Sequence, residues 1–403
     1  MNREREETGG GAAGEEVCVR PLRAGDYDEA LDFLNLVFSM ADRPHDFRRA
    51  LPRMWARDDV HMGRHLAVIR EGRIRAMLGV YPLPAVVAGR RLLFATVGNV
   101  ATHPYETGRG YMARLMEAAR ARLDEMDADA SRLGGLRRRY ARFGYEPVGL
   151  QYTFDLTARD VRSVRRSGCA AAGFEFRPVG AADADLLAQA AALQRRGAMF
   201  VERGGPDDFH RTLVAWEARP AAALAGGRVV GYLVADKDGA SVSECVAQDD
   251  ATAAELLVSW LERSGRDELR VAVQAWRTGL VRRLAALCER WRAASPCHFR
   301  IRRWDRVADA LLALKRGAAA LPDGEATLGI RGWGALRLSV RGRDTAAERT
   351  DAEPDFWLEP DRAAHLLAGT LPPACVCEAP ERLAPLLAAW LPLPLSWCEL
   401  DRV

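Results

Sequence analysis

The sequence predicts an α+β protein built from three consecutive domains. Its 403 residues exceed what one hydrophobic core usually organises. A meander of strands followed by a helix occurs twice along the chain, and the pattern changes a third time near Trp304. We therefore expect domains over 17–157, 158–303 and 304–403. The charged, glycine-rich stretch "MNREREETGGGAAGEE" predicts a disordered tail over 1–16, and it lacks the apolar core of a signal peptide.

The first domain begins with a helix and continues as a meander of strands between about 65 and 104. Glu71-Gly72 and Ala88-Gly89 are the turn signals between its β-branched and aromatic runs. A glycine-containing loop follows and leads into a second helix. One face of that helix is apolar at 3.6-residue spacing, and it carries Met112, Leu115, Met116, Ala119, Leu123 and Met126.

The second domain repeats this order more weakly. Its turns fall at Gly226-Gly227 and Asp238-Gly239, and a helix is expected over Thr252–Leu261. In the third domain, residues 326–342 alternate apolar and polar side chains as a half-exposed hairpin does. Two amphipathic helices are expected after it, over Asp361–Leu367 and Pro380–Trp390.

Composition excludes several classes of function. The chain is 49% apolar and 28% charged, which is typical of a globular protein, and no run of 18 apolar residues could span a membrane. The net charge is only +3 and arginine is spread over the whole chain, so the arginine runs do not indicate a nucleic-acid surface. The eight cysteines form no Cys-x-x-Cys pair, so we expect no metal site. These features predict a cytoplasmic protein.

The most informative stretch is "VATHPYETGRGYMARLM", which begins at Val100. A strand, a loop with two glycines and a helix start occur there in direct succession. The first N–H groups of a helix have no intrahelical partner and carry partial positive charge, so they suit a pyrophosphate. Gly108 and Gly110 let a phosphate approach the backbone, and Arg109 can add charge. The alternative is a plain strand–turn–helix with two turn glycines.

This stretch resembles motif A of the Gcn5-related N-acetyltransferases (GNAT), and "RRRYARFGYEPVG" resembles that family's later Tyr-x-x-Phe-Gly-Tyr segment. The order of the three domains is similar to the Eis (enhanced intracellular survival) type. In that type a catalytic GNAT domain precedes a degenerate GNAT-like copy and a sterol-carrier-like domain. Two positions depart from the motif, because Thr107 stands where the family has Gln or Arg, and Met112 where it has Gly or Ala. We expect these changes to weaken cofactor binding without removing the backbone donors.

The resemblance implies acetyl-CoA as cosubstrate and assigns its contacts. The cofactor-binding residues that it implies are Val100, Ala101, Thr102, Gly108, Arg109, Gly110, Tyr111, Met112, Ala113, Gly135 and Leu136.

The resemblance also names a proton donor and a base. Tyr140 is the general acid that protonates the departing thiolate, unless it is a packed aromatic. The C-terminal carboxylate of Val403 is the base, unless this end is a frayed terminus.

The acceptor side of the site is less clearly marked. In "FSMADRPHDF", Asp42, His45 and Asp46 stand where the first helices of this fold border the acceptor pocket, so they are candidates to hold a cation. A solvated loop is the alternative. In the second domain the corresponding loop reads "VAQDDATAAEL", where Asp249 and Asp250 would repel a phosphate. That half is therefore expected to be a structural copy that binds no CoA.

Together these patterns predict an acetyl-CoA-dependent N-acetyltransferase that acts by direct attack of an amine on the thioester. By resemblance, the acceptors are polyamine-like, aminoglycoside-like or lysine-like, and the protein is a hexamer. The rival hypothesis is a non-catalytic acyl-CoA- or lipid-binding protein whose third domain is the binding module.

Overall fold

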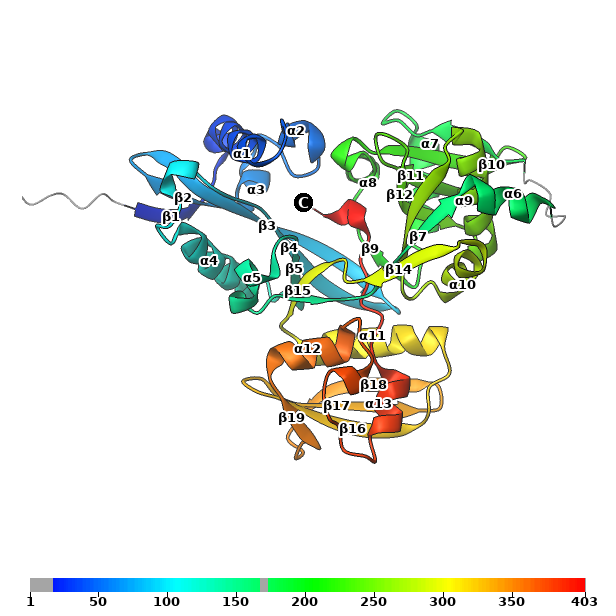
Figure 1. The fold of residues 1–403 in the computed structure, drawn as a ribbon. Coiled ribbons are helices and arrows are strands. Elements are labelled where there is room, and N and C mark those ends of the chain that lie inside the picture. The colour runs from blue at the N-terminus through cyan, green and yellow to red at the C-terminus, as the bar shows by residue number, and fades with distance from the viewer. Residues whose placement is uncertain (1–16, 167–172, 403) are drawn as a thin grey trace, which may run out of the picture.

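The computed structural model describes residues 17–166 and 173–402. The expected tail over 1–16 and the terminal residue Val403 lie outside these ranges. Three sheets organise the described chain, which confirms a mixed α and β architecture of several domains. We refer to their surroundings as the first lobe, the second lobe and the C-terminal lobe (Figure 1).

The first lobe is built on an eight-stranded sheet in the order β1-β2-β3-β4-β5-β15-β6, and β9 pairs with β3. Helices α1 to α3 lie on one side of this sheet, and α4 and α5 lie on the other (Figure 1). The strands are β1 (Val17–Pro21), β2 (His65–Arg70), β3 (Arg73–Val87), β4 (Arg90–Thr102), β5 (Ala130–Leu133), β6 (Glu146–Val148), β9 (Met199–Val201) and β15 (Cys297–Ile301). The helices are η1 (Ala24–Asp26), α1 (Tyr27–Ala41), α2 (Phe47–Ala50), α3 (Asp59–Met62), η2 (Pro104–Glu106), α4 (Tyr111–Glu125), α5 (Arg137–Tyr140) and η3 (Ala141–Phe143).

The second lobe is built on a seven-stranded sheet in the order β14-β7-β13-β12-β11-β10-β8. Its strands are β7 (Gln151–Thr157), β8 (Glu175–Pro178), β10 (Arg219–Ala225), β11 (Arg228–Ala235), β12 (Ser241–Ala247), β13 (Glu268–Gln274) and β14 (Arg290–Ala294). Its helices are α6 (Ala158–Arg166), α7 (Ala184–Gln194), α8 (Pro206–Leu213), η4 (Ala215–Glu217), α9 (Asp250–Ser264) and α10 (Thr278–Leu287).

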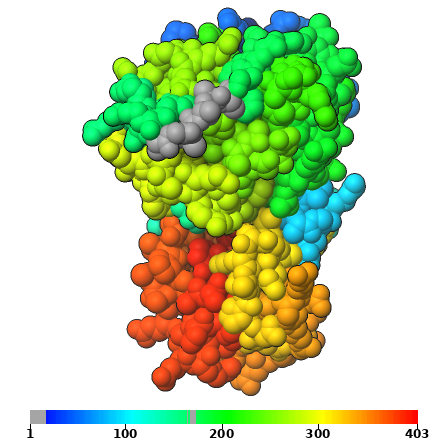
Figure 2. Space-filling view, turned by 90° about the vertical axis from the view of Figure 1, so that its right-hand side faces the viewer, coloured from blue at the N-terminus to red at the C-terminus, as the bar shows by residue number. Residues whose placement is uncertain are grey.

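The C-terminal lobe packs helices on a four-stranded sheet in the order β18-β17-β16-β19. The strands are β16 (Gly324–Ile330), β17 (Gly334–Arg341), β18 (Asp344–Thr350) and β19 (Phe356–Leu358). The helices are α11 (Trp304–Ala318), α12 (Pro360–Ala368), η5 (Pro373–Cys375), α13 (Ala384–Trp390) and η6 (Glu399–Asp401). Figure 2 shows the second lobe stacked on this lobe, with a cyan segment of the first lobe at their junction.

The sheets of the first two lobes exchange a strand, so they do not follow the expected boundaries at 157 and 303. β7 was expected to close the first domain, but it pairs with β13 and β14 in the second sheet. β15 in turn lies between β5 and β6 of the first sheet. The alternation of residues in 151–157 predicts a strand, but it carries no information on which sheet the strand joins.

The C-terminal segment connects all three lobes. After α13 it leaves its own lobe, and η6, drawn in red, lies between the other two (Figure 1). Trp397 is only 2% exposed, and its ring packs against Phe94 with centroids 4.8 Å apart. Leu150 N–H donates to Leu395 O at 2.7 Å, which fixes the segment beside the start of β7. Residues 393–397 of this segment are thus buried inside the molecule.

A buried ion triad anchors the end of this segment. Arg203, which follows β9, donates to Asp401 and to Glu244 of β12, with shortest N–O distances of 3.0 and 2.7 Å. Tyr232 O–H donates a further hydrogen bond to Glu244 at 2.7 Å. Burial opposes the ionisation of Asp401, but the neighbouring guanidinium of Arg203 nevertheless holds the pKa of this carboxyl below its ordinary value. One arginine therefore joins the first sheet, the second lobe and the chain end.

Among the described residues, no helix has the length and apolar character needed to cross a lipid bilayer.

We predict that Arg203→Met strongly destabilises the protein, because it leaves two buried carboxylates without their cation. Breaking a buried ion pair from one side costs about 3–5 kcal/mol. Urea unfolding followed by tryptophan fluorescence measures this loss. The control is Arg211→Met on α8, whose exposed side chain lies 3.8 Å from Asp208; an exposed pair of this kind contributes about 0–1 kcal/mol. Equal midpoints for the two variants would contradict a central role for the triad.

Candidate active site

The site begins where β4 and β5 separate. These strands pair in parallel at Phe94–Ala130, Ala95–Ser131 and Thr96–Arg132, and no pair follows. β4 nevertheless continues to Thr102 alongside β3. Backbone groups on the β5 side of β4 therefore have no strand partner beyond Thr96. The sequence places Val100, Ala101 and Thr102 on this open edge, as expected for residues that would hydrogen-bond an extended ligand.

A bulge in β4 shapes this edge. The β3–β4 register shifts between Met77 and Gly79, and Asn99 adopts a φ of 54°, which is rare for a residue with a side chain. Asn99 Nδ2 donates to the hydroxyl of Tyr81 at 2.7 Å. This hydrogen bond holds Asn99 in its unusual conformation directly before Val100.

The hydrogen bond of Asn99 is one step in a buried chain. The hydroxyl of Tyr81 lies 2.9 Å from His65 Nε2. Burial lowers the pKa of His65 to about 4, so the ring is neutral at physiological pH and Nε2 can accept from the phenol. The ring of Trp55 stacks on His65 with centroids 4.4 Å apart. No sequence motif pointed to these residues. The glycine at position 79 is required by this arrangement, because a Cβ there would lie 2.2 Å from the Tyr81 hydroxyl oxygen.

The N-terminus of α4 is open to an anion. Gly110 is its N-cap residue, with a φ of 78°, and no side chain caps the helix. Gly108 has a φ of 82°, and a Cβ at either glycine would meet nothing within 4 Å. The two glycines are thus required by the backbone conformation, and they leave free space above unpaired N–H groups. A pyrophosphate fits this arrangement. Tyr111 is buried under the helix, and the helix continues through Met112 and Ala113, which are half-buried.

Arg109 does not stand free at this site. Its Nε lies 2.9 Å from Glu106, a buried carboxylate that also lies 3.1 Å from Arg70. Glu106 therefore offsets much of the positive charge of Arg109. The backbone N–H groups are then the principal donors to an anion.

Tyr140 lies at the end of α5 beside Gly135. It is 6% exposed, and a Cβ on Gly135 would lie 2.8 Å from the tyrosine ring. Its hydroxyl has no hydrogen-bond partner among residues 17–166 and 173–402, whereas the hydroxyl of Tyr145 lies 2.8 Å from Ser131 Oγ. Burial raises the pKa of Tyr140, so the phenol keeps its proton at neutral pH. A protonated, unengaged phenol is what a general acid requires. Leu136, just before α5, is exposed.

The candidate acceptor residues separate into two groups. His45 and Asp46 line a cavity of about 340 Å³ between the first two lobes, together with Trp216 and Arg402. Asp46 also accepts from Arg49 N–H at 3.2 Å as the N-cap of α2. Asp42 does not line this cavity, and its side chain is 73% exposed. Glu399 and Leu400 belong to the same wall, so the end of the described chain and the α1–α2 loop border one space.

The second lobe has a different arrangement at the start of its helix α9. Strands β12 and β13 also run parallel for a short distance, at Ser241–Arg270 and Val242–Val271. Helix α9 is capped, because Asp249 accepts from Thr252 N–H at 2.7 Å. Arg277 bridges Asp250, at 3.0 Å, and the backbone carbonyl of Cys245 on β12. Side chains of the chain itself thus occupy the helix start and strand edge that remain free in the first lobe.

The described residues contain no group of three or more His, Cys, Asp or Glu side chains that could hold a metal ion.

Comparisons with known proteins place this geometry in a class. Residues 18–148 match the family model of an acetyltransferase (GNAT) domain. The sequence matches no curated protein.

Several solved structures share the fold over nearly the whole chain. A GCN5-related N-acetyltransferase from Kribbella flavida has a TM-score of 0.69 at 20% identity, over 98% of this chain and 100% of that one. One from Anabaena variabilis has a TM-score of 0.66 at 16% identity, over 96% and 100%. Eis1 from Mycobacterium abscessus has a TM-score of 0.63 at 17% identity, over 96% and 100%.

Residues 18–148, which supply most strands of the first lobe, are therefore a GNAT acetyltransferase domain, and this match supports an N-acetyltransferase. The full-length matches show that the three-sheet arrangement is shared by such structures.

We predict that Gly110→Asp abolishes CoA binding, because it puts a carboxylate beside the place of the pyrophosphate. Gly110→Asn is the matched control, since asparagine has the same size without the charge and tolerates positive φ. Calorimetric titration with CoA should show a small loss of affinity for Gly110→Asn and no measurable binding for Gly110→Asp. Similar affinity for the two variants would refute the anion site at α4.

Proposed function

We propose that this chain transfers an acetyl group from acetyl-CoA to an amine, with the site in the first lobe. The single observation that carries the proposal is the open N-terminus of α4 next to the free edge of β4. CoA would supply the activated acyl group as a thioester. In this proposal the backbone of Gly108–Ala113 binds the phosphates of CoA. Residues Val100–Thr102 and Gly135–Leu136 hold its pantetheine arm, and Tyr140 provides a proton.

The direct route needs an acid near the sulfur and an acceptor for the amine proton. Tyr140 suits the first role because its phenol is protonated and has no partner in the described chain. For the second role we propose the terminal carboxylate of Val403, as the Eis-type resemblance implies. The supporting observation is that Glu399, Leu400 and Arg402 border the same cavity as His45 and Asp46.

The acceptor is proposed to be a cationic amine, of the polyamine, aminoglycoside or lysine kind, that enters through this interlobe cavity. Five carboxylates line this cavity against three cations, which makes its wall negative overall. The carboxylates are Asp46, Glu217, Asp236, Asp238 and Glu399, and the cations are Arg43, Lys237 and Arg402. A panel of such amines with free-thiol detection of released CoA tests the activity. An absence of amine-dependent thiol release would favour the rival, a non-catalytic acyl-CoA- or lipid-binding protein.

We further propose that the second lobe is a degenerate GNAT copy, that the C-terminal lobe is sterol-carrier-like, and that the protein assembles as a hexamer in the cytoplasm. The capped α9 and the Arg277 bridge support the first of these. The titration with CoA described above should therefore give one CoA per chain, and two would contradict it. Sedimentation velocity tests the assembly.

We predict that Tyr140→Phe lowers kcat by about 10²–10⁴, the usual contribution of a positioned proton donor, while CoA affinity is kept. Since the hydroxyl has no hydrogen-bond partner in the described chain, the melting temperature should stay unchanged. Stopped-flow or steady-state thiol release gives kcat.

The control is Tyr145→Phe, which should lower the stability of the protein and leave kcat nearly unchanged. It loses the hydrogen bond to Ser131, which contributes about 0.5–1.5 kcal/mol of stability, and retains most of the activity. A wild-type kcat for Tyr140→Phe would leave this tyrosine with a packing role only.

We also predict that extending the chain beyond Val403 with a short tag cuts kcat/KM, because an amide then replaces the carboxylate and cannot accept the amine proton. Deleting Val403 should act similarly, since it retracts the carboxylate by about 3.3–3.6 Å. Val403→Leu keeps the carboxylate and should have a mild effect. Melting curves must show that the C-terminal lobe is intact. Full activity of a tagged, folded protein would assign the base to a side chain such as Asp46 or to water.

A further inference from the structure

A second cavity, of about 680 Å³, lies between the first lobe and the C-terminal lobe. Its walls come from the end of α4, η3, β15 and the segments 330–333 and 360–364. None of the proposed acetyl-CoA contacts lines it, and neither does Tyr140. It is therefore a separate space from the candidate active site.

The central feature of this cavity is Arg300 on β15. The stem of its side chain lies along Gly144, where an added Cβ would be 3.4 Å from Arg300 Nε and 3.5 Å from its Cδ. Gly144 has a φ of 82°, which favours glycine at this contact. The guanidinium has no hydrogen bond or ion pair with any residue of the described chain. Arg300 thus has a fixed stem and a free charged head.

The surrounding charges leave Arg300 uncompensated. Arg120 is paired with Glu117 at 2.9 Å, and Arg302 is paired with Asp124. Burial lowers the pKa of Arg300; Tyr145 and Asp124 oppose this shift, and the positive charges of Arg302 and Arg120 add to it. At this end of the cavity Arg120 and Arg302 each have a carboxylate partner and Arg300 has none. Such a charge, partly removed from water, is costly unless an anion meets it.

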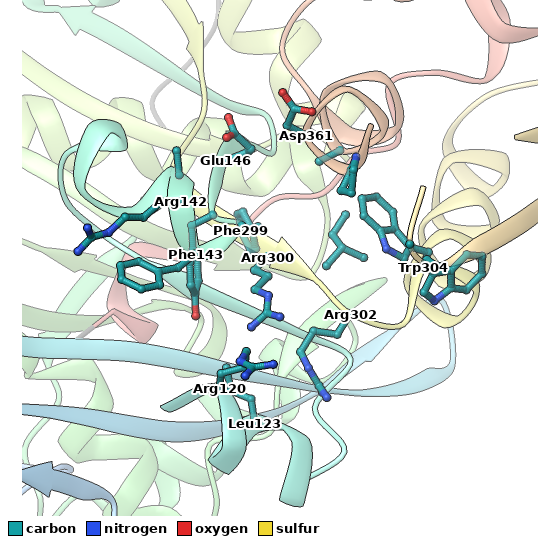
Figure 3. A pocket seen from close by; sticks show the side chains of 18 of the residues that line it. Arg120, Leu123, Arg142, Phe143, Glu146, Phe299, Arg300, Arg302, Trp304 and Asp361 are labelled. Carbon is teal, nitrogen blue, oxygen red and sulfur yellow. The ribbon is translucent and has the colours of Figure 1, made fainter. Parts of the chain in front are cut away.

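The close-up of the cavity shows where an anion would meet these groups. The heads of Arg120 and Arg300 end near one another, and Arg302 lies beside them (Figure 3). The carboxylates of Glu146 and Asp361 lie at the opposite end of the cavity (Figure 3). Glu146 is engaged by Arg137 at 2.8 Å, so it does not neutralise Arg300. The arginine end is therefore positive and the far end is not.

We propose that this cavity binds a small phosphate-bearing molecule, whose phosphate oxygens are held by Arg300 with help from Arg120. Guanidinium donors match the geometry of phosphate oxygens and bind them by charge-assisted hydrogen bonds. The cavity is much larger than a phosphate, so it has room for an attached organic group, and Phe143 and Trp333 offer it apolar surface. Free phosphate and a nucleotide share this chemistry.

The test is calorimetric titration at low ionic strength with three probes: inorganic phosphate, AMP and adenosine. Phosphate and AMP should bind the wild-type protein, and adenosine should not. Tighter binding of AMP than of phosphate would identify a nucleotide as the ligand, and equal binding would identify the phosphate alone. In the Gly110→Asp background, where the anion site at α4 is closed, Arg300→Gln should weaken both by at least about tenfold, and Arg300→Lys, which retains the charge, should weaken them less.

Two controls keep this test separate from the proposed acetyltransferase function. Arg228→Gln removes an exposed strand arginine of the second lobe and should change nothing. Gly110→Asp, which closes the proposed pyrophosphate site, should leave phosphate binding intact. The proposal is overturned if neither phosphate nor AMP binds, if Arg300→Gln in the Gly110→Asp background binds them as well as Gly110→Asp alone while circular dichroism shows it folded, or if Gly110→Asp alone abolishes binding.

Discussion

The arrangement of the lobes depends on one buried cation, Arg203. Its guanidinium bonds Glu244 of the second sheet and Asp401 near the chain end, and β9 just before it extends the first sheet. Both carboxylates are less than one-tenth exposed, and Arg203 is the cation bonded to each of them, with Arg53 and Arg132 adding positive charge near Asp401. The wall of the interlobe cavity includes Glu399, Leu400 and Arg402, so its position follows from the same triad. The triad thereby connects the first two sheets to the segment that forms one wall of the proposed acceptor site.

The second constraint is the short pairing of β4 with β5. A full ladder would satisfy every backbone group of β4 and leave nothing for a ligand. The pairs stop at Thr96, and the bulge at Asn99 follows three residues later, held by Tyr81 and the neutral His65. The open edge is therefore maintained by buried hydrogen bonds on the opposite, α1 side of the sheet. The hydrogen bonds among His65, Tyr81 and Asn99 stabilise the bulge, and the bulge leaves backbone donors of β4 unpaired on its other side.

Much of this site could be predicted from the sequence, because its parts are local. The strand, the two glycines and the helix start follow one another directly, so the order of residues alone predicts the uncapped helix start at Gly108 and Gly110. The strand exchange of β7 and β15 could not be predicted, since alternation of side chains reveals a strand and not its partner. The His65–Tyr81–Asn99 chain was missed for a similar reason. Its members are 16 and 18 residues apart, and each is an ordinary core residue when viewed alone.

The two sheet-and-helix units differ most clearly at the residue that begins each helix. Both have a short parallel pairing followed by a helix. At α4 the N-cap is Gly110, which has no side chain, and at α9 it is Asp249, whose carboxylate takes the N–H group of Thr252. The same partial positive charge of a helix start is thus left available in one unit and neutralised in the other. In the second unit Arg277 also binds the carboxylate of Asp250 and the backbone carbonyl of Cys245, so these groups have partners within the chain itself.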